Sequence, residues 1–143
     1  MTDISVRVVS PGEEADLSAV YALRYEVFVI GQNVPEELEL DEIDPQCDHA
    51  VATIEGEVVG TGRLLPSGVI GRMAVVESRQ RAGIGAAVLS ALEDRARERG
   101  HPAVELHAQL HAAGFYDRAG YERVSEVYLE AGIEHVTMRK RLS

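Results

Sequence analysis

The segment of residues 80–86 joins an apolar run to an amphipathic helix, and it constrains the fold more than any other part of the chain. The preceding run, residues 69–76, has the apolar and β-branched character of a buried strand. After the segment, apolar residues recur every four positions, as on one face of a helix: Ile84, Val88, Leu92 and Ala96. The charged residues between them are expected to face solvent: Glu93, Asp94, Arg97 and Glu98. Gly100 and Pro102 should end this helix.

A loop of this kind can bind a diphosphate. That ligand needs converging N–H donors, small residues that let the backbone approach, and the positive end of a helix dipole. Gly83 and Gly85 offer the small residues, and Arg79 and Arg81 add positive charge. A dinucleotide loop would have Gly or Ala in place of Val88, and a Walker loop would have Lys followed by Ser or Thr. The remaining alternative is a tight strand-to-helix turn without a ligand.

The other elements follow from apolar periodicity and turn residues. We expect a strand at residues 4–9, a helix at 15–30 that Gly31 ends, and a short helix or loop at 36–44. Residues 49–54 and 58–64 should form a hairpin, which residues 69–76 extend into an antiparallel meander. A strand at 103–108, a short helix at 111–119 and two strands at 124–128 and 133–140 complete the order. With 143 residues and no linker-like stretch, residues 1–143 are expected to form one domain.

Composition excludes several classes of function. The chain has 14 Lys and Arg against 24 Asp and Glu, a net charge of −10, which disfavours nucleic acid and anionic membranes as partners. Cys47 is the only cysteine, and His107 and His111 are separated by an expected strand-to-helix boundary, so no metal site is expected. The N-terminus lacks the pattern of a secretory signal and no run is long enough to span a membrane, so a cytoplasmic protein is expected. A monomer and a homodimer both remain possible.

At residues 80–86 the chain resembles the GNAT superfamily of N-acetyltransferases. The family pattern, Gln or Arg followed by two residues, Gly, one residue, and Gly or Ala, is matched by Gln80, Gly83 and Gly85. Further residues resemble the ElaA-like branch of the family: Leu23, Arg24, Val27, Phe28, Val29, Gln32, Val34, Asp41, Asp44, Ala108, Gln109, Phe115, Tyr116, Gly120, Tyr121, Glu130, Ala131, Gly132, Ile133, His135 and Met138. Two positions depart: Gly31 stands where the branch often has Glu, and Gln109 where the family often has Asn.

The resemblance implies a mixed α/β fold, with about four helices and a mostly antiparallel seven-stranded sheet whose fourth and fifth strands splay apart. It implies acetyl-coenzyme A (acetyl-CoA) as co-substrate and direct transfer of the acetyl group to an amine in a ternary complex. The acid-rich residues 36–44 favour a cationic acceptor, such as a small amine, a polyamine or a peptide amine. Two alternatives remain: a non-catalytic acyl-CoA sensor on the same fold, and transfer of a larger acyl group.

The same resemblance assigns residues to the site. The coenzyme would be bound by Met73, Ala74, Val75, Gln80, Arg81, Ala82, Gly83, Ile84, Gly85, Ala86, Gln109 and Tyr116. Tyr116 would also protonate the leaving thiolate as general acid. Strand alternation places Glu105 and His107 on one face near the splay, so either is a candidate base, and the acceptor-side acids are candidates by resemblance. The acceptor would be bound by Arg24, Phe28, Gln32, Asp41, Asp44 and His135, although a histidine like His135 often has only a structural role.

Overall fold

The computed structural model describes residues 3–13, 15, 17–35, 39, 42–80 and 82–142, and the strands among them form one sheet. The strands are β1 (Ser5–Val9), β2 (Asp48–Ile54), β3 (Glu57–Leu64), β4 (Val69–Val75), β5 (Ala103–Gln109), β6 (Glu122–Arg123), β7 (Tyr128–Glu130) and β8 (Ile133–Arg141). Their order is β1-β2-β3-β4-β5-β8-β6, with β7 paired to β8. All pairs are antiparallel except β4 with β5. The predicted mixed fold and mostly antiparallel sheet are confirmed.

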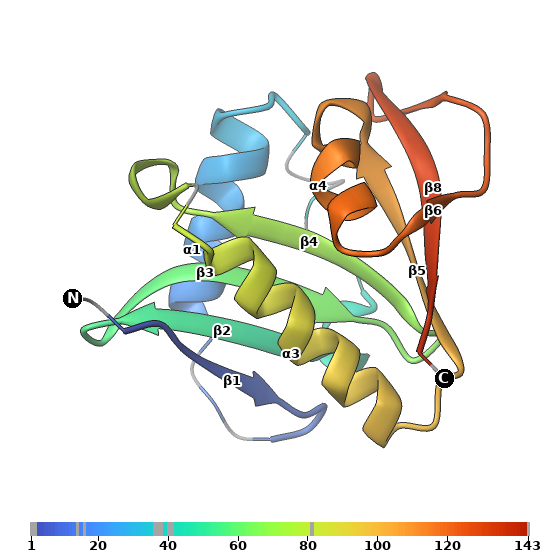
Figure 1. Ribbon diagram of the computed structural model, residues 1–143. Coiled ribbons are helices and arrows are strands. Elements are labelled where there is room, and N and C mark those ends of the chain that lie inside the picture. Colours follow the sequence, from blue (N-terminus) through green and yellow to red (C-terminus); the bar gives the residue numbers. More distant parts are fainter. Residues whose placement is uncertain are drawn as a thin grey trace.

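The helices cover both faces of this sheet (Figure 1). Helix α3 (Ile84–Glu98) packs on one face of β1–β4, and α1 (Ser18–Arg24) packs on the opposite face, against β3 and β4. The short α4 (Ala113–Arg118) follows β5 and packs against it. Ile84, Val88 and Leu92 of α3 are buried in the main core, as their spacing predicts. No helix in the described ranges is both long and apolar enough to cross a membrane.

The predicted hairpin and meander are confirmed by the register. Strands β2 and β3 pair around the two residues Glu55 and Gly56, whose φ angles of 52° and 81° are both left-handed. Such a two-residue turn matches the right-handed twist of the strands that it joins. Strand β4 then pairs antiparallel with β3, which completes the meander that leads to the loop at residues 80–86.

The helix predicted at residues 15–30 changes character in its second half. An α-helix covers Ser18–Arg24, and a π-helix covers Tyr25–Ile30 before the predicted end at Gly31. The Gly31 N–H donates to the Glu26 carbonyl, five residues back, at 3.0 Å. A Cβ at position 31 would lie 2.7 Å from the Val27 carbonyl oxygen, so only glycine fits this wider turn without displacement. π-Helical turns are rare in proteins, and those that occur are often found at functional sites.

Two local predictions are wrong. Of the strand predicted at residues 124–128, only Tyr128 lies in a strand, as the first residue of β7. The Ser125 hydroxyl accepts the Thr137 N–H at 2.9 Å, so a side chain replaces the backbone partner between β6 and β7. The described residues therefore form a sheet of eight strands, where seven were expected. Glu93 does not face solvent but is 6% exposed. It accepts hydrogen bonds from Tyr121 at 2.8 Å and Lys140 at 3.1 Å, two residues far along the chain that cover this side of α3.

A buried ion cluster holds the α1 face together. Arg24, 1% exposed, donates to the Glu39 carboxylate at 2.6 Å and to both Asp44 oxygens at 2.9 and 3.2 Å. Arg63 of β3 donates to the same Asp44 carboxylate at 2.8 Å, and Arg72 of β4 donates to the Glu39 carbonyl at 3.1 Å. The charges of Arg24, Glu39, Asp44 and Arg63 are nearly desolvated, and each buried carboxylate lies against guanidinium groups. The cluster thereby joins Glu39 and Asp44 to α1 and to two strands.

Burial alone would raise the pKa of Asp44, but hydrogen bonds and charge attraction from Arg24 and Arg63 outweigh it and hold the pKa at about 2. The pKa is therefore lower in the folded than in the unfolded chain, where it is ~3.9. The ionised Asp44 therefore stabilises the folded state fully at pH values above the pKa of the unfolded chain, ~3.9. That stability is lost as pH falls through about 2.

We predict that Asp44→Asn lowers the free energy of unfolding at pH 7 by roughly 3 kcal/mol, because it removes the negative charge that two buried guanidinium groups share. The loss should shrink as pH falls from about 4 toward 2, where the wild-type carboxylate is itself protonated. Urea denaturation at several pH values measures both effects. Asp94→Asn is the control, since Asp94 pairs with Arg97 on the exposed side of α3 and should matter little. Equal effects of the two variants would contradict this account of the cluster.

Candidate active site

The loop before α3 ends at a glycine in the left-handed conformation. Gly83 has a left-handed φ of 84° and is the N-cap residue of α3, and no side chain caps the helix there. Among the described residues, no side chain therefore accepts from the N-terminal N–H groups of α3 as a cap. Gln80 before the loop is exposed and Arg79 is half-buried, whereas Arg81 lies outside the described residues. A fifteen-residue helix directs its positive end at this turn.

The second loop glycine lies where three elements meet. A Cβ at Gly85 would lie 3.5 Å from the Phe115 ring on α4 and 4.0 Å from Val75 on β4. The start of α3 is therefore in close proximity to the end of β4 and to α4. This arrangement places the loop beside the last residues of β4.

Strands β4 and β5 pair over only two positions and then separate. The register joins Val69 with Glu105 and Ile70 with Leu106, and no later β4 residue pairs with β5. Immediately beyond, β4 carries a bulge: Arg72 and Met73 together oppose one residue of β3, and Arg72 has a left-handed φ of 49°. A bulge bends a strand and increases its twist. The bend thus occurs where the parallel pairing with β5 ends.

The three β4 residues assigned to the coenzyme lie along this separated stretch. Ala74 is buried and pairs with Thr61 of β3. Met73 directs its sulfur to the α3 side, within 2.6 Å of where a Cβ on Gly62 would lie. On the side of β4 that faces β5, no strand in the described residues continues the ladder past Ile70. Such an edge can pair with an extended ligand.

Tyr116, the predicted general acid, lies on α4 between two other rings. Its ring is edge-on to Phe115 and Tyr121, with centroids 5.0 and 5.8 Å apart. The residue is 9% exposed, and burial raises its pKa to about 12. The hydroxyl is therefore protonated at neutral pH and able to donate a proton or a hydrogen bond.

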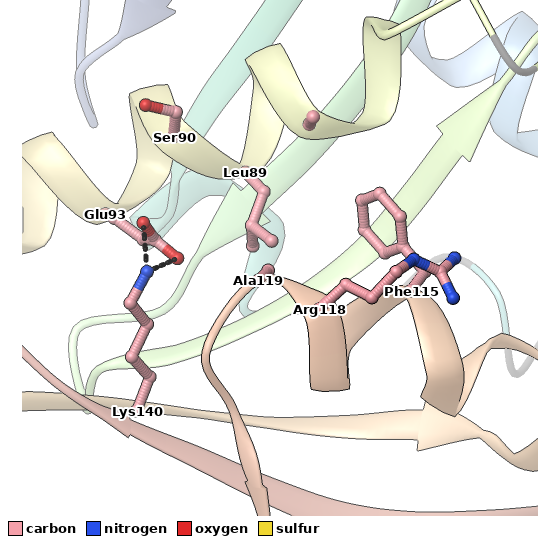
Figure 2. Close-up of a pocket in the computed structure, with 8 residues that line it drawn as sticks. Leu89, Ser90, Glu93, Phe115, Arg118, Ala119 and Lys140 are labelled. Carbon is pink, nitrogen blue, oxygen red and sulfur yellow. Dashed lines mark hydrogen bonds and ion pairs between the residues drawn. The ribbon is translucent and has the colours of Figure 1, made fainter.

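A pocket of about 320 Å³ lies between α3 and α4, next to the loop. Figure 2 shows Leu89, Ser90 and Glu93 of α3 on one side, and Phe115 and Arg118 of α4 on the other. The Lys140 ammonium closes one end and is bound to the Glu93 carboxylate. The pocket therefore combines an apolar lining with a guanidinium at its edge.

The α1 face of β5 carries the polar residues predicted by strand alternation. Glu105, His107 and Gln109 are partly or largely exposed, while the residues between them are buried in the core. Gln109 and Gln32 exchange hydrogen bonds through their side-chain amides, at 2.7 and 3.3 Å. A residue predicted to bind the coenzyme and one predicted to bind the acceptor are thus partners. His135 of β8 lies opposite Gln109 in the register.

The other predicted acceptor residues are divided between two places. Arg24 and Asp44 lie in the buried ion cluster, where their polar atoms contact one another. Phe28 is half-buried in the π-helix, and its carbonyl accepts the Val34 N–H at 2.9 Å. Asp41 lies outside the described residues. The direct acceptor roles of this group remain predictions.

Some residues of this region are not identified by sequence reasoning. Arg118 can be recognised as a pocket residue only when α4 is known to lie beside α3. Glu130 on β7 lies between His107 and His135, and the Ala131–Gly132 turn is the sequence signal that could have located it, because a two-residue turn fixes the register of β7 on β8. Within the part of the chain that the structure describes, no three His, Cys, Asp or Glu side chains converge as a metal site.

The comparisons with known proteins agree with this geometry. Residues 11–142 match the family model of the acetyltransferase (GNAT) domain. YyaT of Bacillus subtilis is 38% identical over 91% of this chain and 92% of its own. ElaA of Escherichia coli is 33% identical over 90% of this chain and 92% of its own, and its crystal structure superimposes with a TM-score of 0.87, covering 97% of this chain and 100% of ElaA.

A crystal structure of an acyl-CoA N-acyltransferase from Pseudomonas aeruginosa is similar as well. It has a TM-score of 0.86 and 31% identity, and the match covers 96% of this chain and 99% of that protein. The separated β4 and β5, the glycine turn and the matched family model lead to one conclusion. The chain belongs to the GNAT family of acetyltransferases, with the ElaA proteins among its relatives.

Proposed function

We propose that this protein binds acetyl-CoA and transfers the acetyl group to an amine by direct attack in a ternary complex. The observation that carries the proposal is the separation of β4 from β5 beside the uncapped start of α3. An extended pantetheine arm needs a free strand edge, and the diphosphate attached to it needs N–H donors at one end of that edge. The two features lie next to each other in this fold.

Each part of the coenzyme has a different chemical requirement, and we match each requirement to a part of the site. Its diphosphate would accept hydrogen bonds from backbone N–H groups at residues 82–86, and its pantetheine arm would run along Met73, Ala74 and Val75. The nucleotide would then extend toward the pocket between α3 and α4, where Arg118 supplies positive charge to an otherwise anionic protein. A β4 N–H aimed at the thioester oxygen would stabilise the charge that develops during attack.

Acetyl transfer requires two proton transfers, and a different group would carry out each of them. An alkyl ammonium has a pKa of ~10.4, so it must lose a proton before its nitrogen can attack. The candidate proton acceptors predicted from the sequence, Glu105 and His107, lie on the polar face of β5. Attack forms the C–N bond and breaks the C–S bond, and the departing thiolate takes a proton from the Tyr116 hydroxyl. Tyr116 regains a proton from the new amide nitrogen through solvent.

We predict that Gly83→Ala weakens CoA binding roughly tenfold or more, because its Cβ would occupy the space needed by the diphosphate. Gly100→Ala, at the other end of α3, is the matched control. Both glycines have a φ near +84°, at 84° and 83°, and a Cβ on either meets no atom within 4 Å. Each variant should lose about 1 kcal/mol of stability through backbone strain alone. Calorimetric titration with CoA that shows equal affinities for both variants would contradict the proposed loop function.

Turnover of Tyr116→Phe should fall by roughly 100-fold, while its affinity for CoA stays nearly unchanged, because the phenol acts on the leaving thiolate. Tyr121→Phe removes a hydroxyl from the adjacent ring, which donates to Glu93, and should cost about 1 kcal/mol of stability while turnover is kept. Release of free thiol from acetyl-CoA, measured with a panel of amines, tests both variants. CoA binding by wild type without thiol release for any amine would instead indicate a sensor.

A further inference from the structure

Four titratable side chains form a chain of contacts on the α1 face of β5, β7 and β8. The Glu105 carboxylate lies 3.9 Å from Nε2 of His107, whose Nδ1 lies 3.3 Å from Oε1 of Glu130. Oε2 of Glu130 in turn lies 3.6 Å from Nε2 of His135. Carboxylates and imidazoles therefore alternate from Glu105 to His135. Tyr128 of β7 stacks on the His135 ring, at 6.1 Å between centroids.

This chain of contacts has one buried end and one exposed end. The His135 side chain is 8% exposed, whereas Glu130 is 48% exposed and His107 is 41% exposed. His135 pairs in register with Gln109, the last residue of β5, which is the strand that separates from β4. The buried end thus lies beside the end of the separating strand, and the exposed end reaches solvent.

The hydrogen bonds of the two histidines fix where their ring protons lie. Nδ1 of His135 is 2.7 Å from the Ile133 carbonyl oxygen, which can only accept, so this nitrogen carries a proton. Nδ1 of His107 likewise donates to the Glu130 carboxylate at 3.3 Å. In a neutral His135, Nε2 is consequently a lone-pair acceptor that faces a second acceptor, Oε2 of Glu130. A separation of 3.6 Å is too long for a direct hydrogen bond, but a guest that donates N–H or O–H can bridge the two acceptors.

We infer that Glu130 and His135 form the site that receives the ammonium of the acceptor and removes its proton, with Nε2 of His135 as the proton acceptor. This inference rests on the proposed acetyltransferase activity. Glu130 attracts the ammonium and then stabilises the imidazolium, as a carboxylate does beside a catalytic histidine. His107 binds the other oxygen of Glu130 and fixes its orientation. The acceptor is accordingly an amine that arrives as a cation.

The proton balance follows from this geometry. One N–H bond of the ammonium breaks and an Nε2–H bond forms on His135, which leaves a neutral amine to attack the thioester. The imidazolium then releases its proton to solvent past Glu130, whose carboxylate is about half exposed. No electrons leave the reacting groups, and each turnover gives an amide, a free thiol and one proton. Glu105 and His107 at the exposed end, with Tyr128 over the ring, are the other titratable groups facing the pair.

The test uses Glu130→Gln and His135→Gln in the full-length chain. The most active primary alkylamine of the panel is compared at pH 7 with its fluorinated analogue, which is largely neutral there. Both variants should lose roughly 100-fold in turnover with the ammonium, but little with the neutral amine. The loss for the ammonium should shrink as pH approaches its pKa of ~10.4, where solvent removes the proton instead. Affinity for CoA should stay unchanged.

Glu134→Gln is the matched control, because Glu134 is an exposed glutamate on the same hairpin, opposite Leu129, and outside the chain of contacts. It should have wild-type turnover with both amines. The inference is overturned if Glu130→Gln keeps full activity with the ammonium, or if it loses equally with both amines at every pH.

A second measurement separates failure of this inference from failure of the proposed function. If wild type releases no thiol with any amine, the proposed activity is excluded. Titration of the alkylamine followed by NMR of the histidine ring nitrogens then decides the binding site. The His135 signals should shift in wild type and in the Glu134→Gln control, but not in Glu130→Gln. Unchanged His135 signals in wild type would overturn the proposed ammonium site.

Discussion

The site depends on the early end of the parallel pairing between β4 and β5. Two register pairs, at Val69 and Ile70, join the halves of the sheet, and the bulge at Arg72 and Met73 then turns β4 away. A buried strand edge without a partner is costly, because backbone N–H and C=O groups need hydrogen bonds. An extended ligand can supply them, and the glycine turn before α3 places helix N–H groups beside the same edge. The fold thereby provides backbone donors for an anionic coenzyme despite the net charge of −10.

The two faces of the sheet have different chemistry around that opening. On the α3 face, Phe115 and Tyr116 extend an apolar core, and burial keeps the Tyr116 hydroxyl protonated. On the α1 face, the ion cluster around Arg24 holds Glu39 and Asp44 against β3 and β4. The alternating histidines and carboxylates lie across the opening, on β5, β7 and β8. The coenzyme would approach from one face and the amine from the other, so that each proton transfer has its own group.

The sequence predicts best those features that depend on local patterns. The β2–β3 hairpin follows from its turn residues, and α3 follows from the spacing of Ile84, Val88 and Leu92, with Gly83 at its start. Features that depend on distant partners are missed. The helical spacing predicts that Glu93 lies on the surface, but in the structure Tyr121 and Lys140 cover it.

Register and side-chain competition explain the other differences from the sequence prediction. Residues 124–128 have strand-forming valines, but the Ser125 hydroxyl competes with the backbone ladder. Glu130 gains its position only from the register of the last hairpin. Amide hydrogen exchange tests the central claim most directly: saturating CoA should slow exchange at Met73, Ala74 and Val75, and at the first residues of α3, far more than elsewhere. Unchanged exchange at these β4 amides in the presence of bound CoA would show that the coenzyme does not fill the gap beside β4.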